Sequence, residues 1–168
     1  LGALPFGFLV AKAHGVDIFK AGSGNPGATN VKRVLGAKAG NTVLGLDMLK
    51  GAVATGWPLI PAVGAPDPLL LALIGIVAAV LGHAFSVFTG FRGGKSVATA
   101  AGGLLVLIPL ACGIGAVTWV LAFYAFRYVS LASILAAVAV ILSVWVIPHH
   151  LAVSVIASLL ALFVIVRH

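Results

Sequence analysis

The sequence predicts an all-α fold, a polytopic integral membrane bundle of seven transmembrane helices that form one domain over residues 1–168. Hydrophobic residues make up 62% of the chain and charged residues only 8%, and the mean hydropathy is +1.23. An ordinary soluble domain carries about 25% charged residues, so this composition indicates a chain that lies in lipid. The long apolar runs lack the polar alternation of membrane strands, which favours helices over a barrel.

Glycine, proline and charged residues divide the chain into apolar runs, each of which is a candidate span. A full crossing needs about 20 residues, so the first, fourth and fifth runs are short. Pro109, Gly113 and Gly115 leave open that the fourth and fifth runs form one broken helix. The predicted spans are 1–11, 41–59, 69–88, 95–110, 112–126, 129–147 and 151–166.

Basic residues occupy alternate links between these runs. Several lie in the link 12–40. The others are Arg92 and Lys95 after the third run, Arg127 before the sixth and Arg167 after the seventh. With seven crossings all of these links fall on one side, which the positive-inside rule assigns to the cytoplasm. Joining the fourth and fifth runs would break that pattern. We therefore expect an outside N-terminus, a cytoplasmic C-terminus and a first span trimmed at its start. The net charge of +7 then reflects topology, and no nucleic-acid partner is expected.

The first polar block is Gly22–Arg33, GSGNPGATNVKR. Its glycines permit positive φ and close backbone approach, so that consecutive N–H groups can form an anion nest. The side chains of Ser23, Asn25, Thr29 and Asn30 add hydrogen-bonding groups, and Arg33 can bind a phosphate in bidentate fashion. The block also matches G-x-G-x-x-G, but a dinucleotide site needs a βαβ unit. A flexible loop whose basic residues only set topology is the alternative.

The second polar block is Gly90–Thr99, GFRGGKSVAT. Gly93 and Gly94 precede Lys95 at the start of the fourth run, and the N-terminus of a helix is suited to bind phosphate. Arg92 and Lys95 add positive charge. The block is not a Walker A loop, because Thr89 stands where that loop needs its first glycine. Again, a role in topology alone remains open.

Ionisable residues inside the runs are few. Asp47 and Lys50 lie three apart and hence on one helix face, either as a structural ion pair or as part of a ligand site. His83 is either a helix–helix hydrogen-bonding residue or functional, and we expect Cys112 to be inert. No set of residues has metal-ligand spacing or forms a catalytic triad, so we expect no metal and no cofactor.

These motifs together resemble the bacterial membrane glycerol-3-phosphate acyltransferases that use acyl phosphate as donor. The resemblance covers nearly the whole chain and implies seven spans in the bacterial cytoplasmic (inner) membrane, with an active site facing the cytoplasm. It implies acyl transfer from acyl phosphate to the sn-1 hydroxyl of glycerol 3-phosphate, giving lysophosphatidic acid and phosphate. It is carried by GSGNPGATN followed by VKRVLGAKAG, then DMLKG, GHAFSVFTGFRGGKSVAT and RYVSLASI.

The resemblance also assigns residues. The first block is expected to bind glycerol 3-phosphate and the second to hold acyl phosphate, with Ser23, His83, Lys95 and His168 in catalytic positions. Three positions depart from the family pattern: an Asn three residues after His168 would lie beyond the chain, Ser96 replaces a Gly, and Arg92 stands where Lys is common. The expected substrate-binding residues are Gly24, Asn25, Gly27, Thr29, Asn30, Arg33, Asp47, Lys50, Arg92, Gly93, Gly94, Thr99 and Ser130.

Acyl phosphate already has a good leaving group, so positioning and oxyanion stabilisation would suffice for catalysis. We expect direct attack by the glycerol hydroxyl without an acyl-enzyme, with its proton passing to the donor's phosphate or to His168. The partners are then glycerol 3-phosphate, acyl phosphate and membrane lipid, and a bundle of this size could work as a monomer. The alternatives are a transporter of phosphate or organophosphate, which would typically show internal repeats, and a purely structural membrane protein.

Overall fold

Helices account for all of the regular structure. The computed structural model describes all residues 1–168 and contains eight α-helices, three short 3-10 helices and no strand, which confirms the all-α class. Pro109 begins the sixth helix, and Pro68 begins the fourth, at the first-turn position where proline loses no hydrogen bond. The α-helices are α1 (Phe6–Ala13), α2 (Ala28–Leu35), α3 (Ala37–Gly56), α4 (Pro68–Ala84), α5 (Val97–Leu107), α6 (Pro109–Phe126), α7 (Val129–Val146) and α8 (Leu151–Val166).

Three segments are long and apolar enough to cross a membrane: α4 with its following turn, α6 and α7, with mean hydropathies of 2.3, 1.7 and 2.5. The helices α5 and α8 are apolar but shorter. The first predicted span corresponds to α1, of eight residues, and the second to α3, of 20 residues. The count of seven crossings and the placement of the termini stay predictions.

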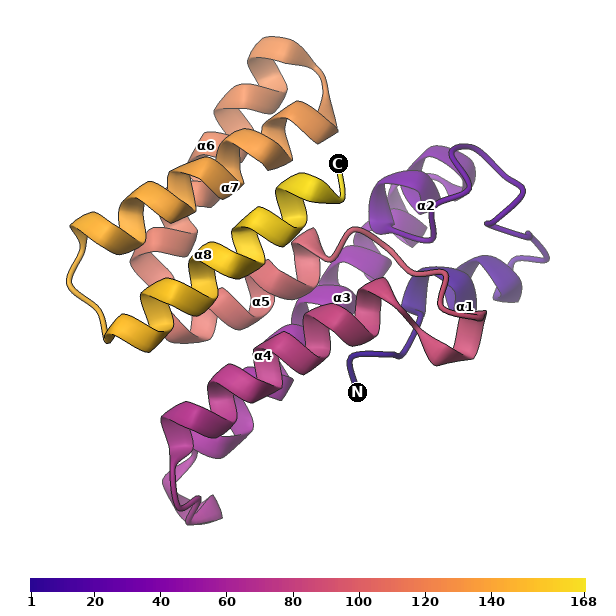
Figure 1. The fold of residues 1–168 in the computed structure, drawn as a ribbon. Coiled ribbons are helices and arrows are strands. Elements are labelled where there is room, and N and C mark those ends of the chain that lie inside the picture. The colour runs from indigo at the N-terminus through magenta and orange to yellow at the C-terminus, as the bar shows by residue number, and fades with distance from the viewer.

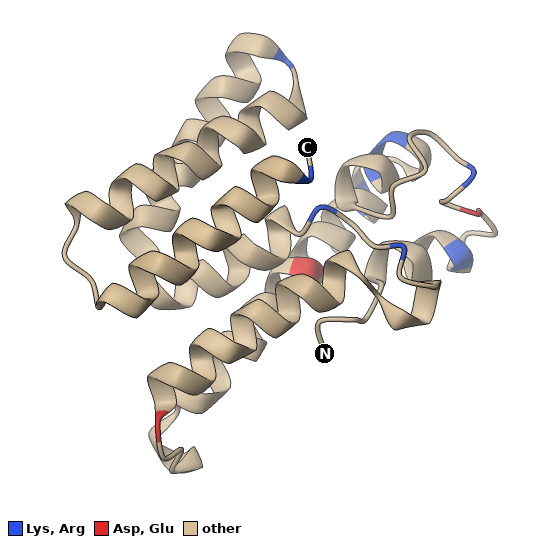
Figure 2. Ribbon diagram, viewed as in Figure 1, with Lys and Arg blue, Asp and Glu red and all other residues tan.

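The fourth and fifth predicted spans are two helices. Ile108 lies between them with φ −140 and ψ 63, outside the helical region, and the chain reverses its direction there (Figure 1). As a result α5 begins at the end of the bundle where α8 ends. Lys and Arg gather at this end and around α1 and α2, while the opposite end, where α3 leads to α4 and α7 to α8, has none (Figure 2). This one-sided distribution is the pattern from which the topology was predicted.

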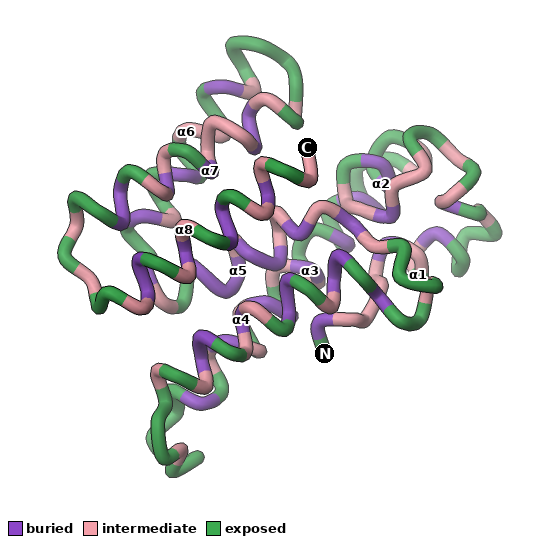
Figure 3. The backbone as a smooth tube through the Cα atoms, viewed as in Figure 1, coloured by how far each residue is buried: buried purple, intermediate pink, exposed green.

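Glycines allow the helices that carry the polar residues to approach closely. A Cβ on Gly51 of α3 would lie 2.0 Å from the carbonyl oxygen of Thr99, and one on Gly102 of α5 would lie 1.9 Å from that of Met48. On α4, a Cβ on Gly75 would lie 2.0 Å from the oxygen of Ala54. Small residues at such crossings are typical of membrane helices. The main hydrophobic core lies between α4, α5, α7 and α8, and buried residues recur along each of these helices (Figure 3).

One element was not predicted. Helix α2 lies in the link 12–40, which sequence analysis assigned to a loop, and it contains the second half of the first polar block. A small core holds it against its neighbours: Val31 of α2 packs with Ile18 and with Val43 of α3, and all three are fully buried. The first block is therefore a loop anchored on a packed helix.

Candidate active site

The first polar block is organised by Asn30. This side chain, 3% exposed, accepts a hydrogen bond from the backbone N–H of Ser23 at 2.8 Å and donates one to the carbonyl of Ala21 at 3.0 Å. Arg33 donates to the same Asn30 oxygen at 3.4 Å. Two glycines take the positive φ values expected of a nest, Gly22 at 58° and Gly24 at 70°. Asn30 thus shapes the loop, and its predicted contact with substrate stays a prediction.

The polar side chains of this block that face solvent are those of Ser23, Thr29, Lys32 and Arg33, all of them exposed. Asn25 accepts a hydrogen bond from the N–H of Gly27 at 2.8 Å, closing a local turn just before α2. The turn itself fits tightly against α1, where a Cβ on Gly7 would collide with the carbonyl of Pro26. The block therefore presents a hydroxyl and a guanidinium on a rigid support.

The second polar block wraps around the end of α4. The N–H of Gly94 donates to the carbonyl of His83 at 3.2 Å, and a Cβ on Gly93 would lie 1.9 Å from that same oxygen. A Cβ on Gly94 would lie 2.3 Å from Nε2 of the His83 ring. The glycines of this block are hence needed for close approach to His83. Helix α5 begins at Val97, two residues later than the sequence predicted, and no side chain caps its N-terminus.

Arg167 closes this end of the site, and sequence analysis assigned it only to topology. Its guanidinium donates to the carbonyl of Gly94 at 3.2 Å and lies 5.3 Å from the ring of Phe85, while its Nε is buried without a partner. Partial burial and the charge of Arg167 lower the pKa of Lys95. Burial also lowers the pKa of His168, against the hydrogen bond to the Val164 carbonyl, and Lys95 adds to the lowering.

Asp47, Lys50 and His83 form a buried cluster behind the second block. Asp47 and Lys50 are each 2% exposed, and Nζ of Lys50 lies 2.8 Å from Oδ1 of Asp47 and 2.7 Å from Nδ1 of His83. The same Nζ donates to the carbonyl of Leu4 at 2.9 Å. An ion pair is much less costly at this depth than a lone charge. No group of three His, Cys, Asp or Glu side chains lies together in the chain as a metal site would require.

The other predicted residues are separate from this cluster. Thr99 is fully buried in α5, where its hydroxyl has no partner and its carbonyl packs on Gly51. Ser130 is exposed at the start of α7, with no side-chain hydrogen bond. Arg92 of the second block contacts the link 12–40, because its guanidinium lies 4.4 Å from the ring of Phe19. The roles predicted for Thr99 and Ser130 stay predictions.

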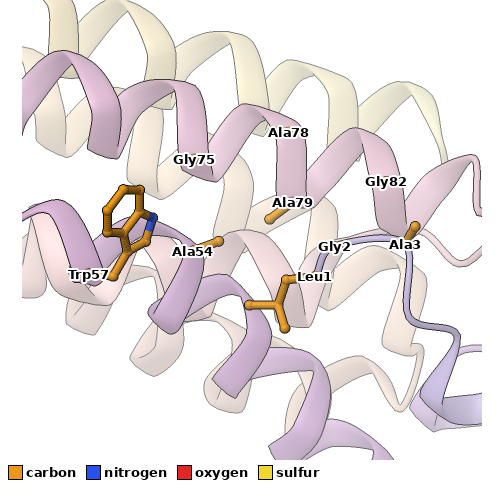
Figure 4. A pocket seen from close by; sticks show the side chains of 9 residues that line it. All are labelled: Leu1, Gly2, Ala3, Ala54, Trp57, Gly75, Ala78, Ala79 and Gly82. Atoms are coloured by element: carbon orange, nitrogen blue, oxygen red, sulfur yellow. The ribbon is translucent and has the colours of Figure 1, made fainter.

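An apolar pocket of about 370 Å³ opens between α3, α4 and the N-terminal segment. It is lined by nine residues, among them Leu1, Ala54, Trp57, Gly75 and Gly82 (Figure 4). None of the predicted site residues lines it, so it is separate from the polar blocks.

Comparison with known proteins identifies the family. All of residues 1–168 match the family model described as glycerol-3-phosphate acyltransferase. The glycerol-3-phosphate acyltransferase of Bacillus cytotoxicus is 46% identical over 169 residues, covering 100% of this chain and 82% of the relative. That of Bacillus subtilis is 44% identical over 174 residues, covering 100% and 84%.

Solved structures give the same answer. A crystal structure of PlsY, an integral membrane glycerol 3-phosphate acyltransferase, in its glycerol 3-phosphate form matches with a TM-score of 0.90 and 39% identity. Its lysophosphatidic acid form matches with a TM-score of 0.88, and in both cases 99% of this chain and 82% of that chain are covered. The two glycine-rich blocks, the buried Asp–Lys pair and the helical membrane bundle thus have one common explanation, and this chain belongs to the glycerol-3-phosphate acyltransferase family of membrane proteins.

Proposed function

We propose that this chain transfers an acyl group from acyl phosphate to the sn-1 hydroxyl of glycerol 3-phosphate, giving lysophosphatidic acid and inorganic phosphate. The relatives are glycerol-3-phosphate acyltransferases, and the solved neighbour has glycerol 3-phosphate and lysophosphatidic acid forms. The observation that carries the proposal is the second block: Gly93, Gly94 and Lys95 lie between the ends of α4 and α8 and the uncapped start of α5, beside Arg167.

The second block has the chemistry to hold the phosphate of the donor. The first N–H groups of α5 lack a side-chain cap, and a helix N-terminus in that state attracts anions. Arg167 is close enough to Lys95 for its charge to lower the pKa of Lys95. No carboxylate pairs with either of them, because the salt bridges of the chain involve only Asp17 and Asp47. A bound phosphate would supply the missing negative charge.

The first block would hold glycerol 3-phosphate. Arg33 offers a planar guanidinium that can bind a phosphate in bidentate fashion, and the exposed hydroxyls of Ser23 and Thr29 can add hydrogen bonds. Asn30 keeps Ser23 and Arg33 in one place through the two hydrogen bonds it accepts. Arg92 of the second block lies against the ring of Phe19, three residues before the first block, so the two blocks are near one another.

The reaction needs no protein nucleophile. The sn-1 oxygen attacks the acyl carbon, the bond between that carbon and the phosphate oxygen breaks, and phosphate leaves with the electron pair. The hydroxyl proton passes to an oxygen of the leaving phosphate or to His168, whose pKa is lowered by burial. Basic groups and N–H donors stabilise the developing oxyanion, and holding both anions in place supplies the proximity.

The apolar helices account for the lipid side of the reaction. Exposed leucine, valine and phenylalanine side chains cover the bundle, so an acyl chain can lie along it in the membrane while its phosphate stays at the basic end. We place this end at the cytoplasmic face of the inner membrane, because the positive-inside rule assigns the basic links there.

The test is lysophosphatidic acid formation by purified protein given glycerol 3-phosphate with acyl phosphate, acyl-CoA or acyl-carrier protein as separate donors. Acyl phosphate alone should support turnover, and Lys95→Ala and Ser23→Ala should abolish most of it. Lys38→Ala is the matched control, since Lys38 is an exposed basic residue outside both blocks. Turnover with the thioesters only would refute the donor. Uptake of glycerol 3-phosphate into liposomes without turnover would refute acyl transfer and favour a transporter.

A further inference from the structure

Nζ of Lys50 lies within hydrogen-bonding distance of the ring of its neighbour His83. An ammonium group has three N–H donors and no acceptor. Three acceptors lie around Nζ of Lys50: Oδ1 of Asp47 at 2.8 Å, the carbonyl of Leu4 at 2.9 Å and Nδ1 of His83 at 2.7 Å. The side chain of Lys50 is 1% exposed, so no water competes for these donors.

A contact of 2.7 Å between an ammonium and a ring nitrogen needs one donor and one acceptor. Lysine can only donate, so Nδ1 of His83 must carry its lone pair and the neutral ring must carry its proton on Nε2. We propose that Lys50 is a positioning residue that holds His83 in the neutral Nε2–H tautomer, so that the ring presents a hydrogen-bond donor at Gly94 in the second block.

The position of Nε2 fits this role. It faces Gly94, where a Cβ would lie only 2.3 Å away. The atom has no hydrogen-bond partner in the protein, yet it is not among the fully enclosed polar atoms. Its N–H is therefore free to donate to a ligand oxygen. This step rests on the function proposed above, in which that oxygen belongs to acyl phosphate. The hydrogen bond from Nε2 then strengthens as negative charge develops on the oxygen.

Asp47 makes the tautomer depend on Lys50. Its Oδ1 lies 3.4 Å from Nδ1 of His83, so it would accept a proton on that nitrogen if the ammonium were absent. Lys50→Met keeps the length of the side chain and removes its three donors. The ring proton would then move from Nε2 to Nδ1, which faces Asp47. Nε2 would change from a hydrogen-bond donor to an acceptor.

The test is nitrogen NMR of the full chain, labelled with 15N-histidine, in lipid nanodiscs at pH 7.5. Protonated and bare ring nitrogens give well-separated signals, and His83→Gln assigns the His83 ring among the five histidines. The native protein should show a proton on Nε2 of His83 only. A proton on Nδ1, or on both nitrogens, would overturn the proposal without any variant.

Lys50→Met should move the proton to Nδ1, where the acceptor-only carboxylate of Asp47 can accept it. Thr55→Val is the matched control on α3, since its hydroxyl bonds only to the carbonyl of Gly51 in the same helix. It should leave the tautomer unchanged. Retention of the Nε2 proton in Lys50→Met would overturn the role of Lys50.

A kinetic comparison tests the donor itself. Glutamine at position 83 can place an N–H close to where Nε2 lies, whereas asparagine reaches only the place of Nδ1. His83→Asn should lower kcat by about 10²–10³-fold, as expected for the loss of one oxyanion donor, and His83→Gln should retain clearly more. Equal losses would overturn the donor role. Failure of the native protein to use acyl phosphate would instead refute the proposed function and leave the tautomer result standing.

Discussion

Replacing Gly51 by alanine tests the helix crossing on which the site is built. The added Cβ would lie 2.0 Å from the carbonyl oxygen of Thr99 and 3.2 Å from the backbone nitrogen of Gly103, both on α5. These are backbone atoms, so no side chain can turn away. To reach ordinary contact near 3.5 Å, the backbones of α3 and α5 must separate by about 1.5 Å.

Such overpacking costs about 1–3 kcal/mol. For a chain of this length each kcal/mol lowers Tm by about 2–4 °C, so Gly51→Ala should unfold about 2–12 °C below the native protein. Helix α5 also positions Lys95 and Ser96, which lie just before its start. A displacement of 1 Å at reacting groups can cost about 10²-fold in rate, so the turnover of acyl phosphate should fall with the Tm.

The assay is thermal unfolding in one detergent, together with the rate of lysophosphatidic acid formation. Gly45→Ala is the matched control, because Gly45 lies on the same helix and a Cβ there meets no atom within 4 Å. Alanine favours a helix over glycine by about 1 kcal/mol, so Gly45→Ala should be at least as stable as the native protein. If Gly51→Ala unfolded at the temperature of Gly45→Ala, the close crossing of α3 and α5 would be refuted.

Three other substitutions have expected outcomes. Ser96→Gly should change Tm little, because it relieves a φ of 62° but loses the hydrogen bond to the Val80 carbonyl at 2.9 Å, and each effect is worth about 1 kcal/mol. Ser96→Ala loses the hydrogen bond and keeps the φ, so it should be less stable than the native protein and than Ser96→Gly. Arg167→Gln should move the alkaline limb of the pH profile of kcat/KM to higher pH. The charge of Arg167 disfavours protonated Lys95, so removing that charge raises the pKa of Lys95. An unmoved limb would show that Lys95 does not set the alkaline limb. Asn30→Ala should raise KM for glycerol 3-phosphate by about tenfold or more, because Ser23 and the loop lose their shared partner at a cost of about 1–3 kcal/mol, and an unchanged KM would remove Asn30 from the acceptor site.

All the helices except α2 could be predicted because each contains an apolar run that ends at a local signal. The predicted seventh run, 151–166, coincides with α8, and the sixth, 129–147, differs from α7 by one residue. Pro109 separates α5 from α6, as the charge pattern required. The first polar block was also predicted to use glycines at positive φ, and Gly22 and Gly24 take such values.

The contacts that make the site could not be predicted from one sequence, since they join distant segments. Lys50 and His83 are 33 residues apart, and Arg167 and Gly94 are 73 residues apart. The local signal for Asp47 and Lys50 was only their spacing, which an ordinary ion pair would share. Helix α2 was missed for a related reason, because the core that holds it depends on Ile18 and Val43 on either side of it.

The distribution of charge is the reason for proposing the anion site at the basic end of the bundle. Inside the bundle, Asp47 and Lys50 cancel each other and His83 is neutral when it accepts from Lys50, so the buried cluster carries no net charge. At the basic end, Arg33, Arg92, Lys95 and Arg167 have no carboxylate partner. The two phosphates of the proposed substrates would neutralise that end only when both are bound. Each bound anion would therefore lower the repulsion among these four cations. The negative charge that balances them would come from the ligands and not from side chains of the protein.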